Sequence, residues 1–299
     1  MNSPSIKNVF YIAIICVLFL LQSFQSKAQP YIDLLNVKYR SLPLTDQTIG
    51  SGDNFQEVSL LLPLQQKNKN YLLVGGDYSN AEFINASENL PNYSLRSGSL
   101  FLGYEQKLKD TSWSRLILFI PKMNSDNKGS SHSFQTGGVL MYKFKKSDNL
   151  KYHFGLYYNS EFFGAYFIPL LGIDWKINSH FNLFGDLPSN LSLEMKANKN
   201  FRMGAGFTSN IATYRVHGQN DLSYIREGDK TWGHDEVHLY FNWYFMEHSV
   251  LFVQAGQSVF RQYNLYNSNN DLLLNSPIQK EKRDGLFFDI GFALRFDSN

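Results

Sequence analysis

Alternation of large apolar side chains with small or polar ones recurs along this 299-residue chain and limits its fold more than any other feature. In segment 286–296 every second residue is large and apolar, and Asp289, Gly291 and Arg295 stand between them. Successive side chains of a β-strand point to opposite faces, so each such segment predicts a strand with one apolar face. Because no helical periodicity lasts three turns after residue 31, we predict an all-β protein. Further alternating segments are 191–196, 201–208 and 237–245.

The second face of these segments distinguishes a membrane barrel from a soluble sandwich. It often carries Gly, Ala, Ser or a lone charge, whereas a soluble sandwich of this size would carry many Lys, Glu and Thr residues. Segments of about ten alternating residues joined by turns are typical of a transmembrane barrel whose apolar face meets lipid. We therefore predict an antiparallel transmembrane β-barrel.

The connections between these segments fall into two classes, short turns and longer loops rich in Gly, Ser and Asn, which alternate along the chain. They separate about 14 strands, with about 12 as the alternative count because segments 31–40 and 181–187 are weakly patterned. Short turns face the periplasm in barrels of this kind, and longer loops face outward. The predicted turns are 66–70, 107–112, 146–149, 176–180, 197–200 and 247–248, and the predicted loops are 41–54, 77–93, 121–133, 160–165, 185–190, 212–236 and 262–284.

The first 28 residues have the pattern of a secretory signal peptide. Lys7 precedes the apolar run 9–21, and small residues precede Gln29. We predict that residues 1–28 are a cleaved signal peptide and that residues 29–299 form an outer-membrane β-barrel. The one cysteine, Cys16, falls in the predicted signal, so the mature chain would hold no disulfide and no zinc-thiolate site.

The charge balance indicates which partners to expect. Segment 1–28 holds two basic residues and no acidic one, so the mature chain keeps 26 of the 28 basic residues against 26 acidic ones. A net charge near zero argues against a nucleic-acid binder, and a mean hydropathy of −0.30 argues against a helical membrane protein. The expected partners are the lipid and lipopolysaccharide of a Gram-negative outer membrane, the barrel-assembly machinery during insertion, and small solutes.

Four prolines bear on the strand boundaries. Pro63 and Pro169 fall inside predicted strands, where a missing N–H group breaks the ladder, so a bulge or a strand end is expected at each. Pro121 and Pro188 are expected at boundaries between strand and loop.

The C-terminal strand gives the sharpest expectation about the two faces. Phe292 should face lipid, so Phe292→Arg should block insertion at a cost of about 2 to 4 kcal/mol near the midplane. Gly291 should face the lumen, so Gly291→Arg should be tolerated better.

The inward faces of the strands would carry the functional residues of a transport protein. Registering each strand by its apolar face places side chains of both charge signs in the lumen. They either pair with one another and plug the barrel or line a weakly selective pore, and loops 212–236 and 262–284 are long enough to fold inward. The predicted lumen-lining residues are Glu105, Lys143, His153, Asp174, Glu194, Lys196, Arg202, His238, Asn242, Asp289 and Arg295.

Segment 234–238, HDEVH, is the most prominent cluster of ionisable residues. Two histidines four residues apart share a face on a helix, but on a strand they lie about 13 Å apart, too far to share a metal ion. The zinc-protease motif also needs Glu after the first His, where this chain has Asp235. Adjacent His-Ser pairs at 132–133 and 248–249 do not make a catalytic triad, which is a spatial arrangement. We therefore predict no enzyme, no metal site and no cofactor.

Three functions remain open for a barrel of this kind. The leading one is a porin-like channel or transporter for small solutes. The second is a closed barrel that serves in surface binding, adhesion or assembly through its extracellular loops, with the Asn-, Tyr- and Leu-rich segment 263–278 making the contacts. The third is a lipid hydrolase with His234 and Asp235 at the outer rim.

Three short motifs in the middle of the chain resemble a known family. Segment 172–178 (GIDWKIN) carries a Trp, segment 181–190 (FNLFGDLPSN) contains Leu-Pro, and Tyr214-Arg215 follows a glycine-containing strand. This order is similar to the centre of an uncharacterised outer-membrane β-barrel family, domain of unknown function 6268, and the resemblance would cover most of the mature chain. It implies the fold and the location. Because the family has no established activity, it implies no functional residue.

Overall fold

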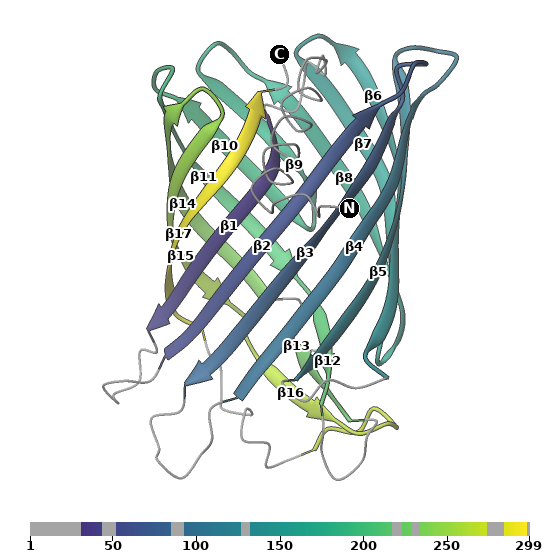
Figure 1. Cartoon of the computed structure of the whole chain (residues 1–299), viewed down its shortest axis with the longest axis vertical. Coiled ribbons are helices and arrows are strands. Elements are labelled where there is room, and N and C mark those ends of the chain that lie inside the picture. The colour runs from purple at the N-terminus through teal and green to yellow at the C-terminus, as the bar shows by residue number, and fades with distance from the viewer. Residues whose placement is uncertain are drawn as a thin grey trace, which may run out of the picture.

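The computed structural model describes residues 31–43, 52–84, 93–126, 132–216, 223–228, 234–273 and 284–297. In this part of the chain 17 strands form one sheet, and 14 of them close into an antiparallel barrel (Figure 1). The predicted signal peptide lies outside the described residues, so its cleavage stays a prediction. The barrel strands are β1 (Tyr31–Pro43), β2 (Gly52–Gln65), β3 (Tyr71–Ile84), β4 (Tyr93–Lys107), β5 (Trp113–Asp126), β6 (Phe134–Ser147), β7 (Leu150–Glu161), β8 (Gly164–Lys176), β9 (Phe181–Leu187), β10 (Asn190–Lys196), β11 (Phe201–Asn210), β14 (His234–Met246), β15 (Ser249–Val259) and β17 (Leu286–Asp297).

The barrel closes through its first and last strands. β1 to β11 follow one another in chain order around the wall, and β14, β15 and β17 complete it. β17 then pairs with β1 from Tyr31↔Asp297 to Ser41↔Phe288. Closure gives the strands partners on both sides over most of the wall, as a sheet in lipid requires. The prediction of an all-β barrel of about 14 strands is confirmed.

The two faces of the wall follow the alternation in the sequence. On β14 the side chains of His238, Tyr240 and Asn242 are buried, while those of Leu239 and Phe241 are exposed. Large apolar side chains therefore cover the outside of the barrel, as contact with lipid requires. Polar and ionisable side chains gather inside, where each needs a partner.

The six predicted turns lie at one end of the barrel, the top of Figure 1, and all the long connections lie at the other end; we call these the turn end and the loop end. All six predicted turns connect barrel strands as expected. Predicted loops 77–93 and 121–133 begin too early, because β3 continues to Ile84 and β5 to Asp126. Predicted loops 160–165 and 185–190 are two-residue turns, at 162–163 and 188–189. Segments 212–236 and 262–284, predicted as loops, contain further strands.

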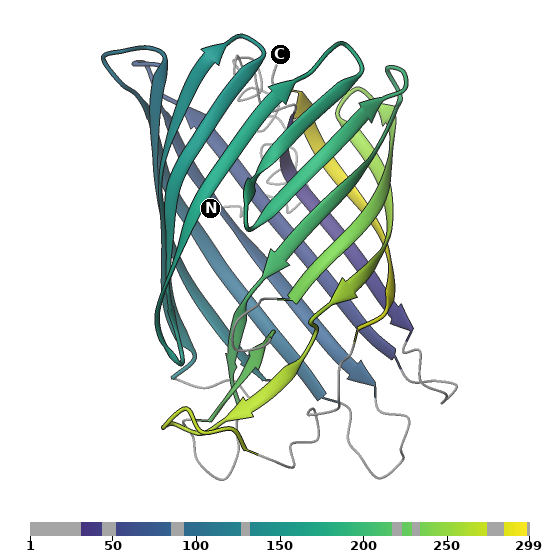
Figure 2. The ribbon, with the colours of Figure 1, turned by 180° about the vertical axis from the view of Figure 1, so that it is seen from behind.

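β9 and β10 have seven residues each, so the wall is lower between β8 and β11 (Figure 2). β8 pairs with β9 only from Leu171 to Lys176, so among the described strands residues 164–170 have β7 alone as a partner. Pro169 lies in this edge segment. A proline is tolerated there because one side of the strand has no ladder to lose.

Pro63 also lies where one side of its strand has no partner, because β1 pairs with β2 only as far as Leu60. Pro188 lies in the β9–β10 turn, as predicted. The prediction for Pro121 is wrong. This residue lies inside β5, at a point where the pairing with β4 is interrupted between residues 119 and 122. An interrupted ladder is another place where a strand tolerates a missing N–H group.

Three short strands cover the loop end: β12 (Ala212–Arg215), β13 (Tyr224–Glu227) and β16 (Tyr263–Tyr266). They form a small antiparallel sheet, which we call the cap. β12 follows β11 in the chain, yet its last residue pairs with Ser125 of β5 on a distant part of the wall, so the cap crosses the loop end (Figures 1 and 2). The buried apolar cluster between the cap and β3–β4 consists of Ala81, Phe83, Leu95, Ala212, Tyr214, Val216, Ile225 and Tyr263.

Candidate functional site in the barrel interior

Most of the residues predicted to line the lumen have buried side chains. The exceptions are Glu105, Lys143 and Lys196, which are less buried. The predicted residues do not form one cluster, because the register of the ladders distributes them over three groups around the wall. The buried ones are His153, Asp174, Glu194, Arg202, His238, Asn242, Asp289 and Arg295.

The first group lies on β4 to β9. Lys143 Nζ is 3.4 Å from Glu105 Oε1. His153 lies between two carboxylates, with Nε2 3.1 Å from Asp174 Oδ2 and Nδ1 2.9 Å from Asp186 Oδ1. These side chains lie close to partners of opposite charge along the wall, so this side of the interior carries paired groups rather than an uncompensated charge.

The second group lies near the loop end around Arg40 of β1. Arg40 Nε donates to Asp289 Oδ1 at 2.7 Å, and Nη2 donates to Glu236 Oε2 at 2.9 Å. Sequence reasoning missed Arg40 because segment 31–40 alternates weakly, and it missed Glu236 because that residue fell in the predicted loop 212–236, whereas β14 begins at His234. The signal that could have found Arg40 is its place directly after Tyr39, because Val37 and Tyr39 are large apolar residues two positions apart and both face outward.

A histidine connects this second group to the cap. His234 Nε2 lies 3.3 Å from Glu236 Oε1, and His234 Nδ1 lies 2.9 Å from Glu227 Oε1 on β13. Tyr263 of β16 also donates to Glu227 Oε1, at 3.0 Å. Burial alone would raise the pKa of Glu227, but the hydrogen bond and charge of His234 hold it below its usual value. The ring of His234 is thus engaged between wall and cap.

The cap is also attached to the opposite wall, at β5 to β7 and the turn that follows. Gln135 Nε2 donates to Thr213 Oγ1 at 2.7 Å, and Asn124 Nδ2 donates to the Thr213 carbonyl oxygen at 3.1 Å. The guanidinium of Arg215 lies 3.9 Å from the ring centroid of Phe162. Polar and cation–π contacts therefore fix β12 where it meets the wall.

The third group lies towards the turn end, where Tyr31 narrows the interior. The ring of Tyr31 packs edge-on against Phe184 of β9, with centroids 5.6 Å apart, although β1 and β9 are not neighbours in the wall. The guanidinium of Arg295 lies 3.7 Å from the Tyr31 ring centroid. Arg295 also donates to both carboxylate oxygens of Asp33, at 2.6 and 2.8 Å.

A polar cavity of ≈ 170 Å³ lies beside Tyr31 inside the barrel. Three buried atoms of its lining residues have no hydrogen-bond partner: His238 Nδ1, the Tyr240 hydroxyl oxygen and Arg295 Nη1. Buried polar groups are costly to leave unpaired, so water or a ligand is expected to reach them. Of the three groups, this one is best suited to hold a solute.

Two glycines of β11 determine how the rings beside the cavity lie. Gly204 is opposite Tyr240 and Gly206 is opposite His238 in the β11–β14 ladder. A Cβ atom at Gly204 would lie 2.7 Å from the Tyr240 ring, and one at Gly206 would overlap the His238 imidazole. Both rings therefore lie along the wall over a glycine, which leaves the cavity open.

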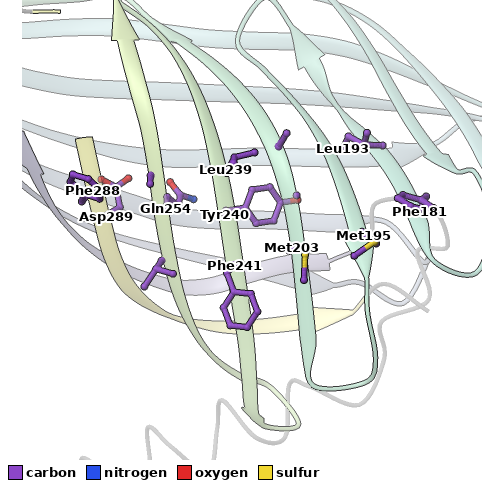
Figure 3. A pocket seen from close by; sticks show the side chains of 14 residues that line it. Phe181, Leu193, Met195, Met203, Leu239, Tyr240, Phe241, Gln254, Phe288 and Asp289 are labelled. Carbon is purple, nitrogen blue, oxygen red and sulfur yellow. The ribbon is translucent and has the colours of Figure 1, made fainter. Parts of the chain in front are cut away.

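A larger hollow of ≈ 710 Å³ lies on the outer surface of the same part of the wall. Figure 3 shows side chains from β9, β10, β11, β14, β15 and β17 around it. Its apolar residues, such as Leu193, Met203 and Leu239, belong to the exposed outer set, and the small Ala205 and Ala255 lie among them. The hollow is therefore part of the lipid-facing surface.

Within the described ranges, no group of three or more His, Cys, Asp or Glu side chains is arranged to hold a metal ion. His234 and His238 are both on β14, which begins three residues earlier than the predicted loop 212–236 allowed, and His234 is engaged by Glu227 and Glu236. In the same ranges, no helix is long and apolar enough to cross a membrane.

Residues of the two adjacent His-Ser pairs are engaged in packing. Ser133 is fully buried, and the ring of His248 stacks on Phe296 with centroids 4.0 Å apart. Ser179 Oγ lies 2.9 Å from His180 Nδ1, but this pair is in an exposed turn. In the part of the chain that the structure describes, these contacts do not combine a nucleophile, a base and an acid.

The closed wall, apolar outside and polar inside, is that of an outer-membrane β-barrel. The family model "Domain of unknown function (DUF6268)" matches residues 61–295, and the chain belongs to this family. This match confirms the resemblance seen in the central motifs. A search of the curated proteins gives no significant match.

Several solved barrels have a similar fold at low identity. The NanC porin is 10% identical, with a TM-score of 0.42 over 87% of this chain and 98% of that one. The outer membrane phospholipase A of Escherichia coli is 13% identical, with a TM-score of 0.37 over 90% of this chain and 98% of that one. The TodX deltaS2S3 mutant monoaromatic hydrocarbon channel is 10% identical, with a TM-score of 0.37 over 87% and 88%. Scores this low do not bear on function.

Proposed function

We propose that this protein is a channel in the outer membrane of a Gram-negative bacterium and that small polar solutes cross it through the barrel interior. The observation that carries the proposal is the polar cavity of ≈ 170 Å³ inside a wall whose charges are mostly paired. A barrel of 14 strands has a backbone radius of roughly 14 Å, more than wall side chains alone can fill.

Two narrowings would make this channel selective. The cap crosses the loop end, and the ring of Tyr31 meets Phe184 towards the turn end. A solute would have to pass both, so we expect a small or gated conductance rather than that of a wide pore.

Single-channel recording in planar bilayers tests the proposal. The refolded barrel should give a small conductance, and a variant with residues 213–226 replaced by a short Gly-Ser linker should give a larger one because the cap no longer crosses the opening. A matched variant shortened at 268–272, which lie at the exposed tip beyond β16, should conduct like the parent. Folded, heat-modifiable barrels that stay silent in all three forms would contradict the proposal.

The exposed tip beyond β16 favours surface binding as a second candidate function. Residues 268–272 are exposed yet ordered, because Tyr224 donates to Asn270 Oδ1 at 2.9 Å and the Asn267 N–H donates to the Asp271 carbonyl at 3.0 Å. A preformed exposed tip suits recognition of a partner. Loss of cell adhesion in the 268–272 variant, together with a silent parent barrel, would support this function over the channel.

A further inference from the structure

The cavity beside Tyr31 is the least explained feature of the interior. Its volume of ≈ 170 Å³ equals about five or six water molecules at roughly 30 Å³ each, or one small solute. Its lining comes from β1, β10, β14, β15 and β17, so the wall lines it and the cap does not.

Three hydrogen-bonding atoms of the lining residues have no partner. The residues that carry them, His238, Tyr240 and Arg295, are 8%, 7% and 6% exposed. A buried polar group left without a partner is unfavourable, so water or a ligand in the cavity is expected to hydrogen-bond to these atoms. The cavity is thus suited to a molecule that can both donate and accept hydrogen bonds.

The charges around the cavity cancel. Arg295 uses Nε and Nη2 to bind both oxygens of Asp33. Close by, Arg202 Nη1 lies 3.7 Å from Glu194 Oε1. An anionic ligand would meet the carboxylate of Asp33 and a cationic one would meet the guanidinium of Arg295, so a neutral ligand fits best.

The rest of the lining is amide and aromatic. Asn242 and Gln254 supply groups that both donate and accept, and Tyr31 and Phe252 supply ring surfaces. A polyol presents hydroxyl groups that match such mixed donors and acceptors. The C–H faces of a sugar ring also pack well against aromatic rings.

We propose that this cavity binds one small neutral polyhydroxyl solute of monosaccharide size, with hydrogen bonds to Tyr240, His238 and Arg295. The inference rests on the proposed channel function and names its solute class. The solute displaces water from the cavity and occupies the three unpartnered atoms.

Calorimetric titration of the detergent-folded barrel with D-glucose and D-xylose tests the binding, with gluconate and glucosamine as charged counterparts. We expect saturable binding of at least one neutral sugar and none of the charged pair. Stronger binding of gluconate or glucosamine would overturn the neutral class. A cavity that holds water only, with no saturable heat for any of the four, would overturn the site.

Two conservative variants locate the site. Tyr240→Phe keeps the ring that lies over Gly204 and removes only the hydroxyl, and Gln254→Met keeps chain length and removes the amide. Each should weaken sugar binding about three- to tenfold, as expected for one hydrogen bond. The control Tyr39→Phe removes a hydroxyl from an outward, 44% exposed side chain and should bind like the parent. Unchanged binding in both cavity variants would overturn the assignment.

Recording on the same samples separates this inference from the channel proposal. Sugar binding by a silent barrel would support the site and contradict the channel. A conducting barrel without saturable sugar binding, and without sugar-induced current interruptions, would keep the channel and overturn the site.

Discussion

The cap and the inner wall restrict the barrel interior in different ways. The cap consists of three strands of four residues each, held mainly by an apolar cluster on its underside. The inner wall consists of ion pairs whose positions follow from ladders of 6 to 14 residue pairs, so those groups cannot move unless the strands move. The cap shares a single backbone bridge with β5 and side-chain contacts with β5 to β7, and the 14 strands of the closed wall pair with one another without it. The contacts of the inner wall therefore determine the stability of the barrel, and the contacts of the cap determine how the loop end is covered.

The largest effect is expected in the wall. Arg40→Leu would remove the guanidinium that both buried carboxylates, Glu236 and Asp289, share and should lower the free energy of unfolding by about 3 to 5 kcal/mol. Urea unfolding in detergent micelles measures this. The control is Lys38→Leu on the same strand, which breaks the partly exposed Lys38–Glu57 pair and should cost about 1 kcal/mol or less. Equal losses of unfolding free energy in the two variants would contradict the expectation that the buried pair contributes more than the partly exposed one.

A smaller and more local effect is expected in the cap. Ile225 is 1% exposed in the apolar cluster, and Ile225→Asp would place a carboxylate there, with a loss of about 2 kcal/mol or more. Hydrogen exchange should show that amides of β12 and β13 lose protection while those of β3 and β4 keep theirs. Leu272→Asp, at a 40% exposed position nearby, should change neither. Loss of protection across the barrel would show that cap and wall are not separable.

The same contrast explains what the sequence could predict. Alternation is a local property, so the strands, the turns and the outer face were predictable from segments such as 237–245 and 286–296. The cap strands are four residues long, too short for a period-2 pattern to show within a loop. The contacts of the interior depend on register around the whole ring. Arg40 and Glu236, which meet inside the barrel, are 196 residues apart in the chain.

Gly291 shows the limit of reasoning from one strand. Its side chain position does face inward, but a Cβ atom there would overlap the ring of Phe252 and lie 2.5 Å from the Val37 carbonyl oxygen. An inward-facing position is therefore not enough for Gly291→Arg to be tolerated, and whether it is tolerated better than Phe292→Arg stays a prediction. The ring that occupies the space comes from β15, so no pattern within the C-terminal strand could have indicated it.

Acid should loosen the cap and leave the wall folded. The pKa of Glu227 lies below its usual value of 4.5 in the closed cap, so the ionised form stabilises closure above that pH. This contribution disappears as the pH falls through the depressed pKa, and exchange of β13 amides should rise several-fold between about pH 5 and pH 3 relative to those of β3. Glu227→Gln should exchange faster than the parent at pH 5 and above, approach the parent's exchange as the pH falls, and lose this rise. A rise that persists in the variant would assign the acid sensitivity to another group.

The smallest effect concerns a contact at the edge of the cap. The guanidinium of Arg226 lies 4.5 Å from the ring centroid of Phe163 in the β7–β8 turn, so Phe163→Leu removes a cation–π contact worth about 0.5 to 1 kcal/mol. Exchange of β13 amides should rise roughly two- to fivefold, because this contact holds β13 on the side away from the apolar cluster. Phe260→Leu, at a 37% exposed position beyond β15, serves as the control and should have no effect on β13. If both variants behave like the parent, the apolar cluster and the Glu227–His234 pair hold β13 without help from the β7–β8 turn, and the cap would be attached to the wall chiefly through β12.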